Sequence, residues 1–273
     1  MFTLNCKGRL LAPGKPVVMG ILNTTPDSFY AGSRLQGTDA VLQRAEQMMK
    51  DGATLLDIGG QSTRPGSEAA GAEEELKRVI PAIEAVNRHF PEAYISVDTY
   101  YGQVATAAVQ AGACIINDIS CGTLDEAMLP AVAALQVPYV LMHMKGRPEN
   151  MQQLASYENV TSDVLDHFIH QRVRLMKMGI YDIIIDPGFG FAKTAAHNFE
   201  LLKNLSSFSI IPAPLLLGIS RKSFIYKTLG ITADEALNGT TALHAIGLMK
   251  GASILRVHDV KEAVETIRLM EHL

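Results

Sequence analysis

The chain has 273 residues, a length that suits one large domain or two small ones. Its composition, 48% hydrophobic and 19% charged, is ordinary for a soluble globular protein, and its formal net charge is −4. No run of Lys and Arg exceeds two residues, so the sequence lacks the basic footprint of a nucleic-acid-binding protein and the cationic patch of a membrane-surface protein. Any anionic ligand must therefore be held by a local cluster of basic side chains.

The cysteines and the N-terminal residues indicate a reducing compartment. Cys6, Cys114 and Cys121 are unevenly spaced and form no CxxC pair. The N-terminus lacks the basic-then-apolar pattern of a signal peptide, and no apolar run approaches the length of about eighteen residues that a membrane span needs. We therefore expect a cytoplasmic protein.

Short apolar runs recur eight times, each followed by Gly-rich or polar residues and then by a helical pattern. They do not alternate apolar and polar residues, which is typical of parallel strands buried on both faces. The runs are Val17–Ile21, Thr54–Ile58, Tyr94–Val97, Cys114–Ile116, Tyr139–Met142, Ile183–Ile185, Leu215–Ile219 and Ile254–Val257.

Eight strands alternating with amphipathic helices predict an α/β fold, a single (β/α)₈ TIM barrel that spans residues 1–273. Phe2–Leu4 and Arg9–Leu11 flank a turn-like segment and predict an N-terminal β-hairpin. A doubly wound open sheet is the alternative, because periodicity alone does not prove closure.

Three further local features carry expectations. Asp259 with Glu262, and Thr232 with Glu235, have the spacing of capping boxes that open helices. Pro81 stands inside a helical pattern, where we expect a kink or a break.

Polar or ionisable residues follow every predicted strand, at the face where such barrels place their active sites. Asp98, Asn117 and Asp186 follow the third, fourth and sixth strands, and their acceptor atoms could surround a flat heterocycle that bears several N–H groups. Phe191 and Met142 are candidate walls for that ring, although plain core packing explains Met142 equally well.

A second, basic set follows strands seven and eight, where these barrels hold phosphate with the help of a helix N-terminus. Arg256 can grip phosphate oxygens bidentately, Lys222 acts as a mobile point charge, and His258 stands two residues after Arg256. Asn23 supplies a neutral oxygen to a Mg²⁺ that keeps its waters and binds phosphates. Together these residues predict a diphosphate pocket.

The first two loops, Asn23–Gly37 and Gly59–Gly71, are long for strand–helix connections. Glycine-containing loops of this length at a barrel mouth commonly act as lids. We expect both to close over the ligand, with Thr63, Arg64 and Pro65 reaching the reacting centre.

Several of these segments resemble the signature motifs of the dihydropteroate synthase family, in the family's order and from about residue 17 to the C-terminus. One departure is Gln61, where many members are expected to have Glu. The matching segments are Gly20–Phe29, Asp57–Gly66, Ser96–Thr99, Ile116–Asp118, Asp186–Lys193, Gly218–Ser223 and Arg256–Asp259.

The resemblance implies an enzyme of folate biosynthesis that joins hydroxymethyl-dihydropterin diphosphate to p-aminobenzoate. It also implies a barrel fold, Mg²⁺ dependence, a homodimer and sensitivity to sulfonamides.

Carried over residue by residue, the resemblance implies pterin contacts at Asp98, Asn117, Asp186 and Lys222, and a diphosphate and metal site at Asn23, Arg256 and His258. It brings Thr63, Arg64, Pro65, Phe191 and Ser220 near the diphosphate and the second substrate. We expect Asp98, Asp186 and Lys222 to be catalytic.

Three other functions remain open on the residues alone. A pterin-binding methyltransferase would share the acceptor pocket, but it would not need the basic pair after strand eight or the Ser62–Gly66 loop. A non-catalytic pterin-binding paralogue would have lost part of the diphosphate set, and no such loss is seen. A barrel acting on a phosphorylated sugar would leave the acceptor pocket unexplained.

Overall fold

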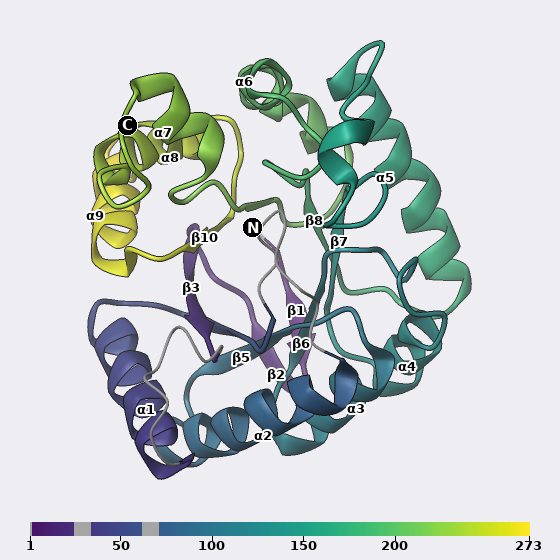
Figure 1. Ribbon diagram of the computed structural model, residues 1–273, viewed down its shortest axis with the longest axis vertical. Helices are drawn as coiled ribbons and strands as arrows, with labels where there is room; N and C mark the ends of the chain where they lie inside the picture. The colour runs from purple at the N-terminus through teal and green to yellow at the C-terminus, as the bar shows by residue number, and fades with distance from the viewer. Residues whose placement is uncertain (1, 25–33, 62–70) are drawn as a thin grey trace.

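A computed structural model describes residues 2–24, 34–61 and 71–273, without the side chains of residues 34–36. Eight parallel strands form one sheet in the order β8-β7-β6-β5-β4-β3-β10-β9, and the helices surround it (Figure 1). The strands are β3 (Val17–Asn23), β4 (Leu55–Gly59), β5 (Tyr94–Asp98), β6 (Ile115–Asp118), β7 (Tyr139–Met142), β8 (Ile183–Asp186), β9 (Leu216–Leu217) and β10 (Ile254–Val257).

The sheet closes on itself. An isolated parallel bridge joins Ile185 of β8 to Leu215, the residue before β9. The predicted (β/α)₈ barrel is therefore confirmed over the open sheet. All eight predicted runs overlap a strand, although the run Leu215–Ile219 keeps only Leu216–Leu217 in the ladder.

Helices follow the strands and cover the outside of the barrel (Figure 1). Within the described ranges, no helix is both long enough and apolar enough to cross a membrane. The helices are α1 (Arg34–Lys50), α2 (Ala72–His89), α3 (Gly102–Ala111), α4 (Met128–Leu135), α5 (Val160–Lys177), α6 (Ala195–Lys203), α7 (Ser223–Leu229), α8 (Leu237–Met249) and α9 (Val260–Met270), with 3₁₀ helices at Met151–Leu154 and Leu205–Ile210.

The floor of the barrel is apolar. Strand residues such as Leu55, Val140 and Ile254 share a buried cluster with Leu4 and Leu11 of the N-terminal hairpin. The hairpin pairs β1 (Leu4–Cys6) with β2 (Arg9–Leu11), so its first strand lies two residues later than predicted. The hairpin thus contributes apolar side chains to the N-terminal end of the barrel.

Inward-facing residues become polar toward the other end. Side chains alternate between the two faces of a strand, so the residue two positions beyond an inward apolar residue also points inward. Two positions after Leu55, Ile115, Val140, Ile184 and Ile254 stand Asp57, Asn117, Met142, Asp186 and Arg256. The fold therefore places a ring of mostly polar groups directly above an apolar floor.

The three local expectations had different outcomes. Helix α2 runs through Pro81 without interruption, so the predicted break is absent. The carboxylate of Asp259 makes no capping bond to α9, because it pairs with Arg221 instead. Glu235 does accept from the backbone N and Oγ of Thr232, at 2.9 and 2.8 Å, but in a turn before α8 rather than at its first residue.

Replacing Leu4 by Ala tests the contribution of the hairpin. Leu4 is 1% exposed, whereas Leu10 on the same hairpin is 65% exposed. Leu4→Ala should lower the free energy of unfolding by about 3 kcal/mol, because it leaves a cavity in the barrel floor. The matched Leu10→Ala should change it by less than about 0.5 kcal/mol. Urea denaturation measures both, and equal effects would mean that the hairpin does not complete the core.

Candidate active site

Arg256 lies at the centre of the polar ring. Its Nε is 2.6 Å from Oδ2 of Asp57, and its Nη2 is 2.5 Å from Oδ2 of Asp98. The side-chain amide of Asn117 donates to the same Asp57 oxygen at 2.9 Å. Residues from β4, β5, β6 and β10 are thereby joined in one network.

Asp57 is the residue that the sequence analysis missed. Only 1% of it is exposed, and it receives hydrogen bonds from both Arg256 and Asn117. Asp57 stands inside the predicted apolar run Thr54–Ile58, whereas Asp98, Asn117 and Asp186 directly follow their runs. The available signal was its spacing, two residues after the inward-facing Leu55.

The electrostatics of the network follow from its burial. Burial raises the pKa of Asp98 above its ordinary value, and the adjacent Arg256 guanidinium opposes that rise. Burial alone would lower the pKa of Arg256, but the carboxylates of Asp57 and Asp98 outweigh burial and raise it. Arg256 therefore stays charged and compensates the acids.

Asp186 extends the acceptor wall from β8. The residue is 7% exposed, and its Oδ1 accepts from the backbone N–H of Gly188 at 2.8 Å. Burial raises the pKa of Asp186, and the nearby Lys222 opposes the rise. One oxygen thus caps the following turn, while the carboxylate as a whole belongs to the polar ring.

Lys222 is held by the loop that follows β8. Its Nζ donates to the carbonyl oxygen of Phe189 and lies 4.6 Å from the centroid of the Phe191 ring, a cation–π contact. Burial lowers the pKa of Lys222 to about 8, and Asp186 opposes that fall. Lys222 therefore keeps its charge near neutral pH.

Phe191 and Met142, the candidate walls for the ring, lie together. Phe191 is 9% exposed and Met142 is 3% exposed, and both belong to one small buried cluster with Met151. Met142 follows the inward-facing Val140 of β7 by two residues, so it points into the barrel at the level of the polar ring.

Ser220 and His258 form a separate pair. Oγ of Ser220 lies 3.0 Å from Nδ1 of His258 and accepts the His258 backbone N–H at 3.2 Å. Arg221 and Asp259, the next residue of each segment, form an ion pair at 2.8 Å. The two strand ends are thereby locked together beside the first turn of α9.

Arg256, which is predicted to belong to the basic set, also contacts the acceptor set. Its side chain reaches from β10 to the carboxylates of β4 and β5, so it lies within the acceptor set. Ser220 and His258, the other predicted diphosphate residues of these strand ends, lie next to each other. Nη1 of Arg256 takes no part in either of these two ion pairs within the described part of the chain.

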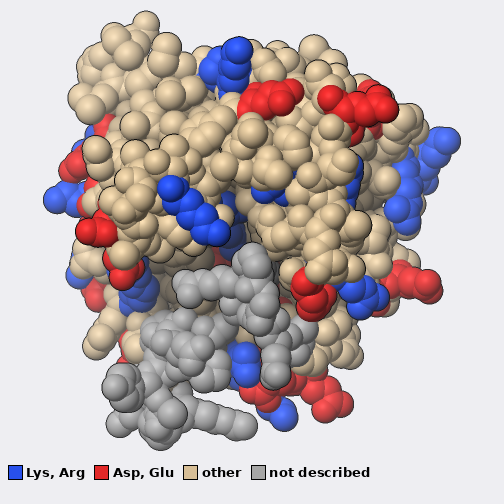
Figure 2. All heavy atoms as spheres, turned by 45° about the horizontal axis from the view of Figure 1, so that its top comes forward, with Lys and Arg blue, Asp and Glu red and all other residues tan. Residues whose placement is uncertain are grey.

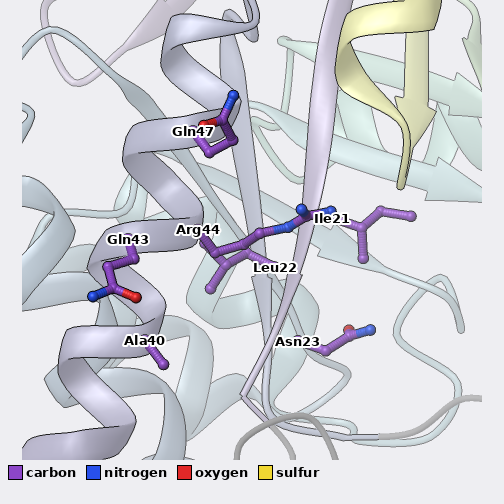
Figure 3. A pocket seen from close by; sticks show the side chains of 7 residues that line it. All are labelled: Ile21, Leu22, Asn23, Ala40, Gln43, Arg44 and Gln47. Carbon is purple, nitrogen blue, oxygen red and sulfur yellow. The ribbon is translucent and has the colours of Figure 1, made fainter.

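A pocket opens beside Asn23 at the end of β3 (Figure 3). In Figure 3, Arg44 reaches from α1 toward β3, while the side chain of Asn23 points away from α1. Arg44 donates to the backbone oxygen of His258 at 3.1 Å, which links this pocket to the Ser220–His258 pair. The lining residues are Ile21, Leu22, Asn23, Ala40, Gln43, Arg44 and Gln47.

The predicted lids lie largely outside the described residues. Thr63, Arg64 and Pro65 are among the residues that the structure leaves undescribed. Gln61, just before them, donates to the buried carboxylate of Glu75 and accepts from the Tyr100 hydroxyl at 2.9 Å. A neutral amide therefore suits position 61, because a second carboxylate there would face that of Glu75.

The distribution of charge fits an anionic ligand. On the face shown in Figure 2, basic side chains lie in a hollow near the centre, and most acidic side chains lie toward the edge. Positive charge is therefore gathered locally although the formal net charge of the chain is −4.

Comparisons with known proteins agree with this site. The model of a family described as pterin binding enzyme matches residues 19–258. The dihydropteroate synthase of Escherichia coli strain K12 is 44% identical over 270 residues, which cover 98% of this chain and 95% of the relative. The chain belongs to the dihydropteroate synthase family.

Solved structures of family members superimpose on nearly the whole chain. The Xanthomonas albilineans dihydropteroate synthase with 4-aminobenzoic acid has a TM-score of 0.92 and 40% identity, and the match covers 99% of this chain and 97% of that one. A Yersinia pestis dihydropteroate synthase in a sulfonamide drug complex has a TM-score of 0.92 and 42% identity, with 99% and 98% covered.

Removing the Asp57 carboxylate tests the network around Arg256. Asp57→Ala should lower the free energy of unfolding by about 3 kcal/mol, because it breaks a buried ion pair and deprives Asn117 of its acceptor. As a control, Asp51→Ala removes a carboxylate that accepts from Gln47 on α1, and it should cost less than about 1 kcal/mol. Urea denaturation measures both, and an Asp57 variant as stable as the native protein would contradict this account.

Proposed function

We propose that the chain condenses (7,8-dihydropterin-6-yl)methyl diphosphate with p-aminobenzoate, giving 7,8-dihydropteroate and diphosphate, a step of tetrahydrofolate biosynthesis. The observation that carries the proposal is the buried acceptor ring, completed by Arg256, at the carboxyl ends of the strands in a member of this family. The ligands named for two solved relatives, 4-aminobenzoic acid and a sulfonamide drug, support the choice of second substrate and sulfonamide sensitivity.

The acceptor ring suits a pterin. The ring system is flat and presents a guanidine-like edge of N–H groups, which Asp186 and Asp98 can accept. Asn117 offers both a donor and an acceptor, although its donor is partly engaged by Asp57. Met142 and Phe191 supply apolar area against which the ring can pack. Lys222 can donate to a pterin oxygen when it leaves the Phe189 carbonyl.

The proposed reaction depends on stabilisation of the charges that develop on the pterin and on the leaving diphosphate, and it needs no strong base. The bond between the methylene carbon and the diphosphate oxygen breaks, and its electron pair leaves with the diphosphate. The arylamine nitrogen then attacks the methylene carbon with its lone pair and loses a proton afterwards. Asp98 and Asp186 favour the positive charge that develops on the pterin, with Lys222 as the third catalytic side chain. His258, Ser220 and Nη1 of Arg256 face the leaving group.

The proposed cofactor is Mg²⁺, held mainly by substrate and water. The described residues contain no group of three or more His, Cys, Asp or Glu side chains that could hold a metal ion by themselves. Mg²⁺ commonly keeps several waters and binds one or two protein oxygens plus phosphates. The side-chain oxygen of Asn23 would be its protein ligand. When bound, Mg²⁺ would supply charge neutralisation to the diphosphate.

A homodimer and a cytoplasmic location complete the proposal. Large apolar side chains are exposed on neighbouring helices: Met249 and Ile246 of α8 are 74% and 39% exposed, and Leu269 of α9 is 72% exposed. Helices α8 and α9, which carry these side chains, are in contact with each other. Exposed apolar area of this kind is what a second copy would cover.

Turnover separates the enzyme from a pterin-binding protein without activity. The chain is incubated with the dihydropterin diphosphate, p-aminobenzoate and Mg²⁺, and the release of diphosphate is followed. Release should depend on p-aminobenzoate, so a reaction without the arylamine is the control. Pterin binding without release would favour the non-catalytic paralogue. A methyl transfer from a reduced folate, with no diphosphate release, would favour the methyltransferase.

The pH dependence of pterin binding tests the role of Asp186. Burial raises the pKa of Asp186 in the free protein, whereas N–H donors from a bound pterin stabilise the ionised carboxylate and lower it. The affinity for the pterin should therefore reach its maximum above the pKa that Asp186 has in the free protein. Below that pKa it should fall about tenfold per pH unit, until the lower pKa that Asp186 has in the complex is reached.

Isothermal titration of the native protein and of Asp186→Asn with 6-hydroxymethylpterin measures this linkage. The neutral variant should bind weakly and without that pH dependence, while its thermal unfolding shows that the fold persists. The same pH dependence in both proteins would exclude Asp186 as the linked group.

A further inference from the structure

We infer that Lys193 is a positioning residue, whose buried ammonium group fixes the loop between β8 and α6 so that this loop can hold Lys222 in the pterin site. The inference rests on the proposed function, because Lys222 is one of the proposed pterin contacts. Lys193 itself reaches neither the acceptor ring nor the Ser220–His258 pair through any of its hydrogen bonds within the described residues.

The ammonium group of Lys193 sits in a cage of acceptors. Its Nζ lies 3.1 Å from the carbonyl oxygens of Gly188 and Phe191, 3.3 Å from that of His143, and 2.9 Å from Nδ1 of His143. Only 3% of the residue is exposed. Because two of these carbonyls belong to the loop and one to the end of β7, the ammonium ties the loop to the neighbouring strand.

The loop needs such a tie because its backbone is unusual. Gly188, Gly190 and Ala192 have φ angles of +69°, +82° and +47°, in the left-handed region. For Ala192 that conformation costs about 1–2 kcal/mol. A Cβ at Gly188 would lie 2.1 Å from the backbone oxygen of His143, so the loop is pressed tightly against the end of β7. Contacts elsewhere must hold this conformation, and the bonds of Lys193 are placed to do so.

The same short loop holds Lys222 from its other side. The carbonyl of Phe189 accepts from Nζ of Lys222, and the ring of Phe191 faces that ammonium at 4.6 Å. A Cβ at Gly190 would lie 3.0 Å from Cδ of Lys222. The carbonyls of Gly188 and Phe191 thus accept from Lys193, whereas the carbonyl of Phe189 accepts from Lys222. A shift of the loop that follows loss of Lys193 must therefore displace Lys222.

The charge states of the cage agree with this arrangement. Burial, and next the charge of Lys193, lower the pKa of His143 to about 2, so its ring is neutral and one nitrogen can accept. Burial lowers the pKa of Lys193 to about 7, and the nearby Asp186 opposes that fall, so the amine is partly protonated at neutral pH and can donate hydrogen bonds in either form. Asp186 therefore lies near two lysines, Lys193 and Lys222. In the proposed function, a ligand can replace the Phe189 carbonyl that Lys222 binds, whereas the carbonyls around Lys193 stay in place.

A double-mutant cycle tests whether Lys193 acts through Lys222. The affinity for 6-hydroxymethylpterin is measured by isothermal titration for the native protein, Lys193→Met, Lys222→Met and the double variant. Lys193→Met should weaken binding about tenfold in the native background and less than about twofold in the Lys222→Met background, because the residue through which it acts is already absent.

A matched control removes another lysine of the same region. Lys145 donates to the backbone oxygen of Ser156 at 2.7 Å and lies 3.7 Å from the centroid of the Tyr157 ring, so it bonds the preceding loop instead. Lys145→Met should leave the pterin affinity within about twofold of the native value. If Lys193→Met does not fold, Lys193→Gln takes its place in the cycle, because its amide can donate to two of the same carbonyls.

Each outcome separates the inference from the proposed function. Equal losses from Lys193→Met in both backgrounds would overturn the inference, and so would unchanged affinity together with lowered thermal stability. A loss from Lys145→Met as large as that from Lys193→Met would overturn it as well. If the native protein does not bind the pterin at all, the proposed function fails first and the inference fails with it.

Discussion

The guanidinium of Arg256 is the interaction on which the mouth of this barrel depends. It neutralises two carboxylates, Asp57 and Asp98, that adjacent strands bring to the same buried region. Without it, like charges would meet where burial already disfavours ionisation. With it, the acids keep their acceptor character, and Asn117 is oriented through its bond to Asp57. A permanent cation built into this ring of carboxylates therefore stabilises it.

The register of the strands determines which side chains point into the barrel. Leu55 and Asp57 share one face of β4, and Ile254 and Arg256 share one face of β10, so the apolar floor and the charged ring come from the same strands. A slip of one residue would turn Asp57 outward and bring an apolar neighbour into the pocket.

The N-terminal hairpin also supports the ion pairs. By completing the floor with Leu4, it keeps water away from the underside of the ion pairs, where it would screen them.

The barrel and much of the site were predictable because the signals are local. Buried parallel strands are continuous apolar runs, and the polar groups that end them, such as Asp186, stand out against those runs. The sequence does not show which charged residue a long side chain will pair with in the fold. Arg256 was assigned to diphosphate and pairs with carboxylates across the barrel. Asp259 had the spacing of a helix cap and pairs with Arg221. Asp57 stands inside an apolar run, and its partners Arg256 and Asn117 come from strands far away in the sequence.

The two cations of the pocket differ in a way that suits their tasks. Arg256 is bound to two carboxylates, and they raise its pKa, so a ligand gains little by attracting it away. Lys222 is held by a neutral carbonyl and an aromatic face, and burial lowers its pKa to about 8. An oxygen of a ligand can replace a carbonyl at little cost, since one hydrogen bond is exchanged for another. In the proposed function, Arg256 therefore stays fixed between the carboxylates, and Lys222 is the cation that can change its partner when a ligand binds. The position of Lys222 before the ligand arrives is set by the loop that carries Phe189, which explains why that loop is bound so tightly from behind.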